Sequence, residues 1–277
     1  MRTINTRRHQ SGLFRSALRA PFAMLCAALF TASLANAEEA PATDPAAVAP
    51  APADSMLSGE QAGRWSVAGG SELSFGWLLR DGELLANPIA TEEPEVPPDL
   101  DWPEPVGDFE LSFEFQIQRM GWGGIEYRMP ESSGRPLRGL FFCICDDAHH
   151  PLSGVGRLGN RSTGALFDVL GPAPSTVVRP LGEWNQARIV ARGTIIEHWI
   201  NGMRALHTDT SRPEFEALTA GSIFRDTPRY GQLPAGRLRL LRGDGRIAYR
   251  HMTLRAPAPA EPPKPDATST ETPPPAT

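Results

Sequence analysis

The chain has 277 residues, with 27 Lys or Arg and 32 Asp or Glu. Residues 1–37 contain five arginines and no acidic residue, so the rest of the chain has 22 basic (27 − 5) against 32 acidic residues, a net charge of −10. This charge argues against nucleic-acid binding, which needs a basic surface. After residue 37 no apolar stretch approaches the ~20 residues of a membrane span, so we expect none in the mature chain.

The first 37 residues have the three parts of a secretory signal. A basic segment comes first, an apolar run follows over 22–34, and Ala35-Asn36-Ala37 provides a small-x-small cleavage site. The apolar run is too short for an ordinary membrane helix of ~20 residues. We therefore predict cleavage after Ala37 and a periplasmic or secreted location.

Two further segments are unlike a folded domain. Residues 38–55 contain four prolines among Ala, Asp and Glu, and residues 256–277 contain eight prolines. Segments with so few apolar side chains do not offset the entropy of ordering, so we expect a linker and a disordered tail. The 200 residues of 56–255 remain, which is enough for one domain with a sizeable core.

The pattern of this domain is that of β-strands. Residues 108–118 alternate strictly, with apolar side chains at every second position from Phe109 to Ile117 and polar ones between. A period of two predicts a half-buried strand. Residues 140–145 are apolar on both faces and predict a second strand. Further strands are expected at 186–191, 195–200, 203–207, 237–241 and 246–254.

Only residues 213–220 have a helical pattern, with Ser211 as the expected N-cap. Many short strands, Gly and Pro turns and almost no helix predict an all-β fold, a sandwich of the jelly-roll type.

Several segments of the domain resemble the 3-keto-disaccharide hydrolase family, which is also described as a 3-keto-glucoside lyase and hydratase domain. The resemblance spans roughly 64–255 and implies a concanavalin A-like lectin/glucanase sandwich, a carbohydrate ligand and cleavage of a 3-keto-glycoside. The segments that carry it are Asp146-Asp147, Arg161-Ser162-Thr163-Gly164-Ala165, Gly182-Glu183-Trp184-Asn185 and Trp199-Ile200-Asn201-Gly202.

The chain departs from the family pattern at polar positions of the expected cleft. Phe141 and Cys143 stand where the family usually has a Glu and a Gln, Trp122-Gly123 replaces its Asn-Ser, and Leu241 replaces a Gln. These departures favour a glycan-binding module that kept the sandwich and lost the chemistry. The retained Arg-x-Thr-Gly-Ala segment favours an exported enzyme. A purely structural envelope domain is the third alternative.

For the enzyme, the resemblance and the chemistry of the side chains together give a set of candidate site residues. A 3-keto group acidifies the neighbouring C2 proton, so elimination needs a base and a group that stabilises the enolate. Asp146 or Asp147 would be the base and Arg128 the electrostatic stabiliser. The residues assigned to substrate binding are Trp122, Glu114, Glu126, Arg161 and Asp168.

The segment from Asp146 to His150 has two further interpretations. Asp146, Asp147, His149 and His150 lie within five residues, and such side chains can hold a divalent cation. Their spacing matches no fixed metal motif, so a turn with hydrogen-bonded Asp side chains is the alternative. No cofactor is certain, and a divalent metal stays open.

The carboxylates of the alternating strand are not a natural catalytic pair. Glu110 and Glu114 are four residues apart, which places their Cα atoms about 13 Å from each other. Paired glycosidase carboxylates lie roughly 5–9.5 Å apart. A solvated sheet face is the alternative for Glu114, and a surface ion pair is the alternative for Glu126 with Arg128.

Four tryptophans are candidate platforms for sugar rings. Trp122 lies in a Gly-rich loop and is the best candidate for an exposed ring, whereas core packing is expected for Trp184 and Trp199. His198, in the middle of a strand, is expected to be a core histidine with satisfied hydrogen bonds. The fourth tryptophan is Trp77. The two cysteines of the domain, Cys143 and Cys145, are expected to be buried free thiols.

Overall fold

The computed structural model describes residues 55–67, 76–86, 99–130, 138–153 and 159–257. The predicted signal segment 1–37 lies outside the described residues, as do nearly all of the linker 38–55 and the tail 256–277. In the described part of the chain, neither helix is long and apolar enough to cross a membrane.

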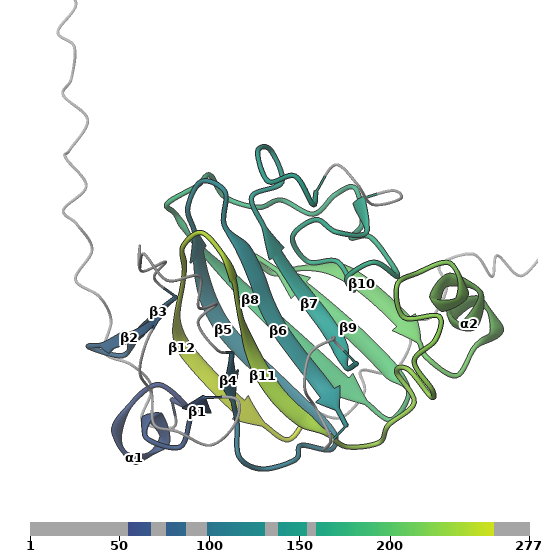
Figure 1. The fold of residues 1–277 in the computed structure, drawn as a ribbon, viewed down its shortest axis with the longest axis horizontal. Helices are drawn as coiled ribbons and strands as arrows, with labels where there is room; N and C mark the ends of the chain where they lie inside the picture. Colours follow the sequence, from purple (N-terminus) through teal and green to yellow (C-terminus); the bar gives the residue numbers. More distant parts are fainter. Residues whose placement is uncertain (1–54, 68–75, 87–98, 131–137, 154–158, 258–277) are drawn as a thin grey trace, which may run out of the picture. The chain divides into compact units, whose positions relative to one another are not determined.

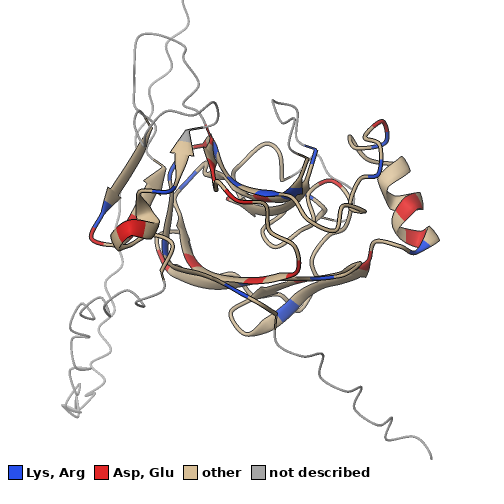
Figure 2. Cartoon of the chain, turned by 90° about the horizontal axis from the view of Figure 1, so that it is seen from below, with Lys and Arg blue, Asp and Glu red and all other residues tan. Residues whose placement is uncertain are grey.

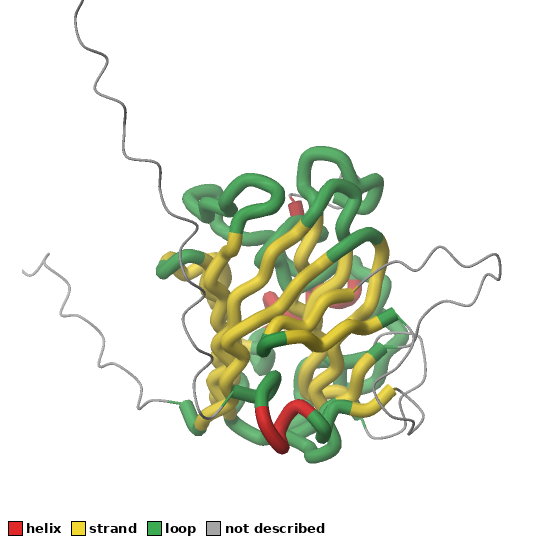
Figure 3. The backbone as a smooth tube through the Cα atoms, turned by 90° about the vertical axis from the view of Figure 1, so that its left-hand side faces the viewer, coloured by secondary structure: helices red, strands yellow, loops and turns green. Residues whose placement is uncertain are grey.

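Two antiparallel sheets lie face to face as two layers, and the loops gather at the ends of the strands (Figures 1, 2 and 3). The first sheet has five strands in the order β1 (Ser66–Val67), β4 (Leu100–Asp101), β11 (Arg237–Asp244), β6 (Trp122–Met129) and β7 (Leu140–Cys145). The second has seven in the order β10 (Met203–Asp209), β9 (Ile195–Ile200), β8 (Trp184–Arg192), β5 (Phe109–Ile117), β12 (Ile247–Arg255), β3 (Glu83–Ala86) and β2 (Trp77–Arg80). The all-β sandwich prediction is confirmed.

The central strand β5 shows why this sequence forms a sandwich. Its apolar side chains from Phe109 to Ile117 are buried, and the polar ones between them are half-buried. Phe113 packs edge to face on Phe142 of β7, with ring centroids 5.7 Å apart, so the two sheets meet through these alternating positions. Each such buried side chain contributes roughly 1.5–3 kcal/mol of transfer free energy.

A polar contact lies within this core. The Tyr127 hydroxyl is 2.9 Å from Nε2 of His198, whose Nδ1 is 3.0 Å from the carbonyl oxygen of Gly164. Burial lowers the pKa of His198 to about 4, so the ring is neutral at pH 7. The prediction of a satisfied core histidine is confirmed.

Some local predictions were wrong. The helix α2 (Pro213–Ala220) forms as expected, but its N-cap is Arg212, because the hydroxyl of Ser211 donates to Asp209 instead. A second helix, α1 (Gly59–Ala62), was not predicted, because four residues are too few to show a helical period of apolar side chains. Trp184 and Trp199 are half-buried on the outer face of the seven-stranded sheet and not in the core.

Candidate functional site

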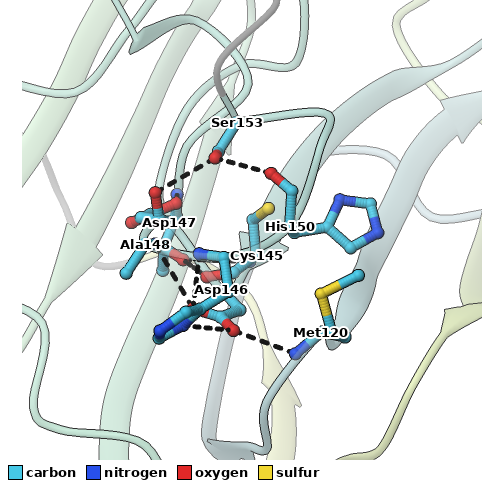
Figure 4. Close-up of polar contacts among 9 residues, drawn as sticks. Met120, Cys145, Asp146, Asp147, Ala148, His150 and Ser153 are labelled. Carbon is cyan, nitrogen blue, oxygen red and sulfur yellow. Dashed lines mark hydrogen bonds and ion pairs between the residues drawn. The ribbon is translucent and has the colours of Figure 1, made fainter. Parts of the chain in front are cut away.

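Asp146 anchors the turn that follows β7. Its own N–H donates to the carbonyl oxygen of Gly121, and its carboxylate accepts the amides of Met120 at 2.9 Å and Ala148 at 3.3 Å (Figure 4). Burial by itself would raise the pKa of Asp146, but the hydrogen bonds from Met120 and His149 hold it below its ordinary value. Asp146 is therefore an ionised structural anchor.

The same carboxylate orients an imidazole. Nδ1 of His149 is 3.0 Å from both oxygens of Asp146, and the His149 side chain is partly exposed. His150 points elsewhere: its ring stacks on Trp122, and its Nε2 is 3.5 Å from Asp244. The two histidines therefore do not converge on one point.

Asp147 has a different environment from Asp146. Its Oδ1 accepts the amide N–H of Thr163 at 2.9 Å, and the Thr163 hydroxyl bonds both backbone groups of Cys145. Burial of the carboxyl group raises the pKa of Asp147 to about 6, although the residue as a whole is exposed. A carboxylate with a pKa near neutrality can accept and return a proton at physiological pH.

A cavity of about 360 Å³ opens beside this carboxylate. The backbone hydrogen bonds between residues 164–167 and β7 place the loop that forms its wall, since Gly164 donates to Cys143 and Phe167 donates to Phe141. The lining residues are Asp147, Gly159, Ser162, Thr163, Pro172, Ala173, Pro174, Thr176 and Val178. The cavity gives Asp147 a space in which a small polar ligand fits.

Three apolar side chains on the outer face of the five-stranded sheet are covered, although Glu126, which pairs with Phe141, lies on the same face. Phe141 and Cys143 have 0% exposure there, and Leu241 has 3%. The ring of Phe167 covers Phe141, with centroids 5.3 Å apart, and the ring of Trp122 packs against both. Phe141, Cys143 and Leu241, three of the positions that depart from the family pattern, therefore lie on one face and are closed off.

Arg161 and Asp168 hold the covering loop in place. Nε of Arg161 donates to Oδ1 of Asp168 at 2.6 Å, and Oδ2 of Asp168 accepts the amide of Ile223 at 2.8 Å. The guanidinium also lies over the Phe167 ring, 5.4 Å from its centroid. These contacts give both residues a structural task above the sheet.

Glu126 and Arg128 lie on β6, and both are buried. Glu126 accepts the amides of Arg138 and Gly139, and burial raises its pKa. Arg128 donates to the carbonyl oxygen of Gly193 and to Asp108 at 3.1 Å, so it ties the end of β6 to the other sheet.

Register separates Arg128 from the acidic turn. Trp122 pairs with Cys145, so the Asp146–Asp147 turn lies at the Trp122 end of β6. Arg128 is six residues further along, about 20 Å away. The structure thus brings Asp147 and Thr163 together, but it does not bring Arg128 to them.

Comparison with known proteins establishes the family. The model of a family described as a 3-keto-alpha-glucoside-1,2-lyase-like domain matches residues 52–255. The chain belongs to this family. It is also similar to a curated 3-keto-disaccharide hydrolase of Bacteroides thetaiotaomicron, with 26% identity over 155 residues, 51% of this chain and 53% of that protein. The chain thus spans about half the length of that relative.

Solved structures support the fold of this 3-keto-glucoside lyase-like domain. One candidate glycosyl hydrolase from Parabacteroides distasonis has a TM-score of 0.61 and 20% identity, covering 70% of this chain and 89% of its own. A second from the same organism has a TM-score of 0.51 and 21% identity, covering 69% and 98%. At these identities the likeness shows the sandwich fold alone.

The remaining expected site residues of the lyase-like domain lie apart. Glu114 is on the outer face of the seven-stranded sheet, where it accepts a hydrogen bond of 2.7 Å from Nε of Arg250. Trp122 is half-buried and not the exposed platform that its Gly-rich loop indicated. Among the residues that the structure describes, no group of three His, Cys, Asp or Glu side chains could hold a metal ion. Cys143 and Cys145 are buried free thiols, as expected.

Sequence reasoning did not find two features of the lyase-like domain. The first is the different environment of two adjacent aspartates, which depends on Met120 and Thr163, far away in sequence. The second is a polar pocket on the outer face of the seven-stranded sheet. The alternation of polar residues along β5 was the signal for it, but the partner strands could not be identified from that pattern alone.

Proposed function

We propose that the chain is an exported carbohydrate-active protein that cleaves 3-keto-glycosides, with Asp147 as the residue that moves the proton. The supporting observation is the position of Asp147: its carboxylate lies at a cavity of about 360 Å³ and is held by the Thr163 amide. Burial raises the pKa of Asp147 to about 6, so the group is mainly ionised at pH 7 and can still return a proton. The family membership supports the substrate class.

The proposed chemistry begins at C2 of the 3-keto sugar. Asp147 removes the C2 proton, and the electrons of that bond form the enolate of the 3-keto group. When the enolate collapses, a C1–C2 double bond forms and the glycosidic oxygen leaves C1 with the proton that Asp147 returns. Water then adds across the double bond if the net reaction is hydrolysis. Asp146 positions the turn, and Arg128 has no part in the proposed step because it lies about 20 Å away.

A second candidate is a glycan-binding module without catalysis. The observation that favours it is the closed outer face of the five-stranded sheet, where Phe141, Cys143 and Leu241 are buried. The polar side chains that the family usually has at these positions would contact a sugar. The apolar side chains of this chain are covered instead. Binding without turnover is the behaviour expected of this candidate.

One experiment separates the two. The purified protein is incubated with 3-keto-trehalose or 3-keto-sucrose, and the products are followed by mass spectrometry. We expect turnover by the wild type, a loss of about 100-fold or more in Asp147→Asn, and no change in the control Asp226→Asn, whose carboxylate is exposed. Full activity of Asp147→Asn contradicts the assignment. Binding without turnover by the wild type leaves the glycan-binding module.

Export is a separate part of the proposal. It rests on the basic, apolar and small-residue segments of 1–37, which lie outside the described residues. We expect the exported protein, isolated from the periplasm or medium, to begin at Glu38 when its N-terminus is sequenced. An uncleaved N-terminus on protein that stays inside the cell contradicts export.

A further inference from the structure

The outer face of the seven-stranded sheet carries a pocket of about 340 Å³. It is formed by side chains of β5, β8, β9 and β12, whereas the Asp147 cavity is formed by loops that follow β7. Its polar lining residues are Ser112, Glu114, Gln186, Arg188 and His251, and the indole of Trp199 lines it as well. Hydroxyl, amide, carboxylate, guanidinium and indole groups thus line one concave site.

The charges of this pocket are paired within the sheet. Glu114 accepts from Nε of Arg250 at 2.7 Å, and Nδ1 of His251 is 3.5 Å from the same carboxylate oxygen. Nη1 of Arg188 is 3.5 Å from Glu110. Because each charged group already has a partner of opposite sign, the pocket suits a neutral ligand better than an ion. The hydroxyl of Ser112 and the amide of Gln186 add neutral donors and acceptors.

A β-bulge shapes the pocket. The register of β12 against β5 shifts between Arg250 and Thr253, and His251 has a φ of 51°. In a regular strand Arg250 and His251 would point to opposite faces, but with the bulge both lie beside Glu114. The left-handed conformation costs energy for a residue with a Cβ, and such strain is typical of binding sites.

A second pocket follows the first along β5. It has a volume of about 280 Å³ and includes Gln116, two residues beyond Glu114 on the same strand face, together with Trp184. The other lining residues are Glu83, Leu85, Gln118, Arg246 and Ala248. From Ser112 in the first pocket to Gln116 in the second, the strand extends about 13 Å.

Each pocket is lined by one tryptophan on which a guanidinium packs. The guanidinium of Arg188 lies 4.4 Å from the ring centroid of Trp199, and that of Arg250 lies 4.1 Å from the ring centroid of Trp184. Both indoles are half-buried on the outer face, and the guanidinium of Arg204 also lies 6.0 Å from the ring centroid of Trp199. Each guanidinium covers part of its indole, so a ligand meets the uncovered part of the ring, once in each pocket.

We propose that this row is a binding site for a neutral oligosaccharide, separate from the Asp147 cavity. Sugar rings pack their apolar faces against the exposed parts of Trp199 and Trp184. Ring hydroxyls bond Glu114, Gln186 and the N–H groups of Arg188 that remain available to a ligand. The site would hold a longer glycan on the outer face of the seven-stranded sheet, opposite the outer face of the five-stranded sheet where Phe141 and Cys143 are covered.

The test is isothermal titration calorimetry of the full chain with cellohexaose, laminarihexaose and maltohexaose, and with a hexagalacturonate as the anionic comparison. We expect at least one neutral hexasaccharide to bind and the hexagalacturonate to bind more weakly. Trp199→Ala and Gln186→Ala should each lower the affinity about tenfold. The matched control is Arg80→Gln, an exposed residue of β2 in the same sheet and outside both pockets.

Three results would overturn the proposal: no binding of any neutral hexasaccharide, tighter binding of the hexagalacturonate, or wild-type affinity in both Trp199→Ala and Gln186→Ala. Circular dichroism checks that each variant folds, and Gln186→Ala decides if Trp199→Ala does not fold. Asp147→Asn should bind the neutral hexasaccharide as the wild type does, because Asp147 belongs to the other cavity. This variant therefore distinguishes failure of the oligosaccharide site from failure of the proposed cleavage.

Discussion

The amide of Thr163 donates to the carboxylate of Asp147 at 2.9 Å, while the hydroxyl of Thr163 bonds both backbone groups of Cys145. One residue thus joins the loop over the five-stranded sheet to the end of β7 and positions the candidate base. The stability of the domain and the position of Asp147 are therefore coupled through Thr163.

Replacing the Thr163 hydroxyl should lower both stability and activity. Thr163→Val keeps the shape but leaves the buried N–H and C=O of Cys145 with fewer hydrogen bonds, which costs about 1–3 kcal/mol. Urea denaturation measures the free energy of unfolding, and Thr208→Val on β10 is the control. Equal stability of the two variants contradicts the role given to this hydroxyl.

The pH dependence of cleavage should follow Asp147. The base must be ionised to accept the C2 proton, and burial raises the pKa of Asp147 to about 6. We therefore expect kcat/KM on a 3-keto-disaccharide to fall as the pH drops below about 6 and to level off above pH 7. A profile that stays flat from pH 7 to pH 5 is incompatible with Asp147 as the base.

The buried histidine should make the domain less stable in acid. Burial lowers the pKa of His198 from 6.5 to about 4, so between these values the unfolded chain binds more protons than the folded one. The contribution of His198 is complete above pH 6.5 and declines as the pH falls toward 4, by about 3 kcal/mol in total. Urea unfolding at pH 7.0 and pH 4.5 measures this change in the free energy of unfolding. The free energy of unfolding of His198→Gln should depend less on pH than that of the wild type. The same pH dependence in both proteins rejects the assignment.

The ion pair above the sheet should matter more than exposed pairs. Asp168→Ala removes the partner of Arg161 and the acceptor of the Ile223 amide, and we expect a loss of about 3 kcal/mol in unfolding free energy. Asp226→Ala breaks an exposed pair with Arg225 and should change stability by less than about 0.5 kcal/mol. Similar effects of the two substitutions would show that the Arg161 pair does not hold the loop.

Much of the fold was predictable because strands with one buried face have a strict period. In β5 the alternation from Phe109 to Ile117 matches the burial along the whole strand. In β9 the expectation held for His198, which is inside, but failed for Trp199, which is on the outer face. A period of two gives the alternation but not which set faces inward, and here hydrogen bonds to Tyr127 and Gly164 satisfy the buried histidine.

The candidate site was predictable only in part. The sequence indicated the acidic turn, but it could not separate Asp146 from Asp147, because distant partners determine their different pKa shifts. Arg128 belongs to the family pattern, yet its distance from the turn depends on the register of β6 against β7. The apolar run of β7 indicated cover on both faces, and only the structure identifies Phe167 as the ring that covers Phe141.

The most direct test of Asp147 as the proton-transfer residue is hydrogen exchange at C2. A 3-keto-disaccharide is incubated in deuterated water with wild-type protein, Asp147→Asn or Asp226→Asn, and NMR follows deuterium at C2 together with cleavage. We expect the wild type and Asp226→Asn to cleave the glycosidic bond or to introduce deuterium at C2, and Asp147→Asn to do neither above the uncatalysed rate. Exchange or cleavage by Asp147→Asn at the wild-type rate would contradict the central claim.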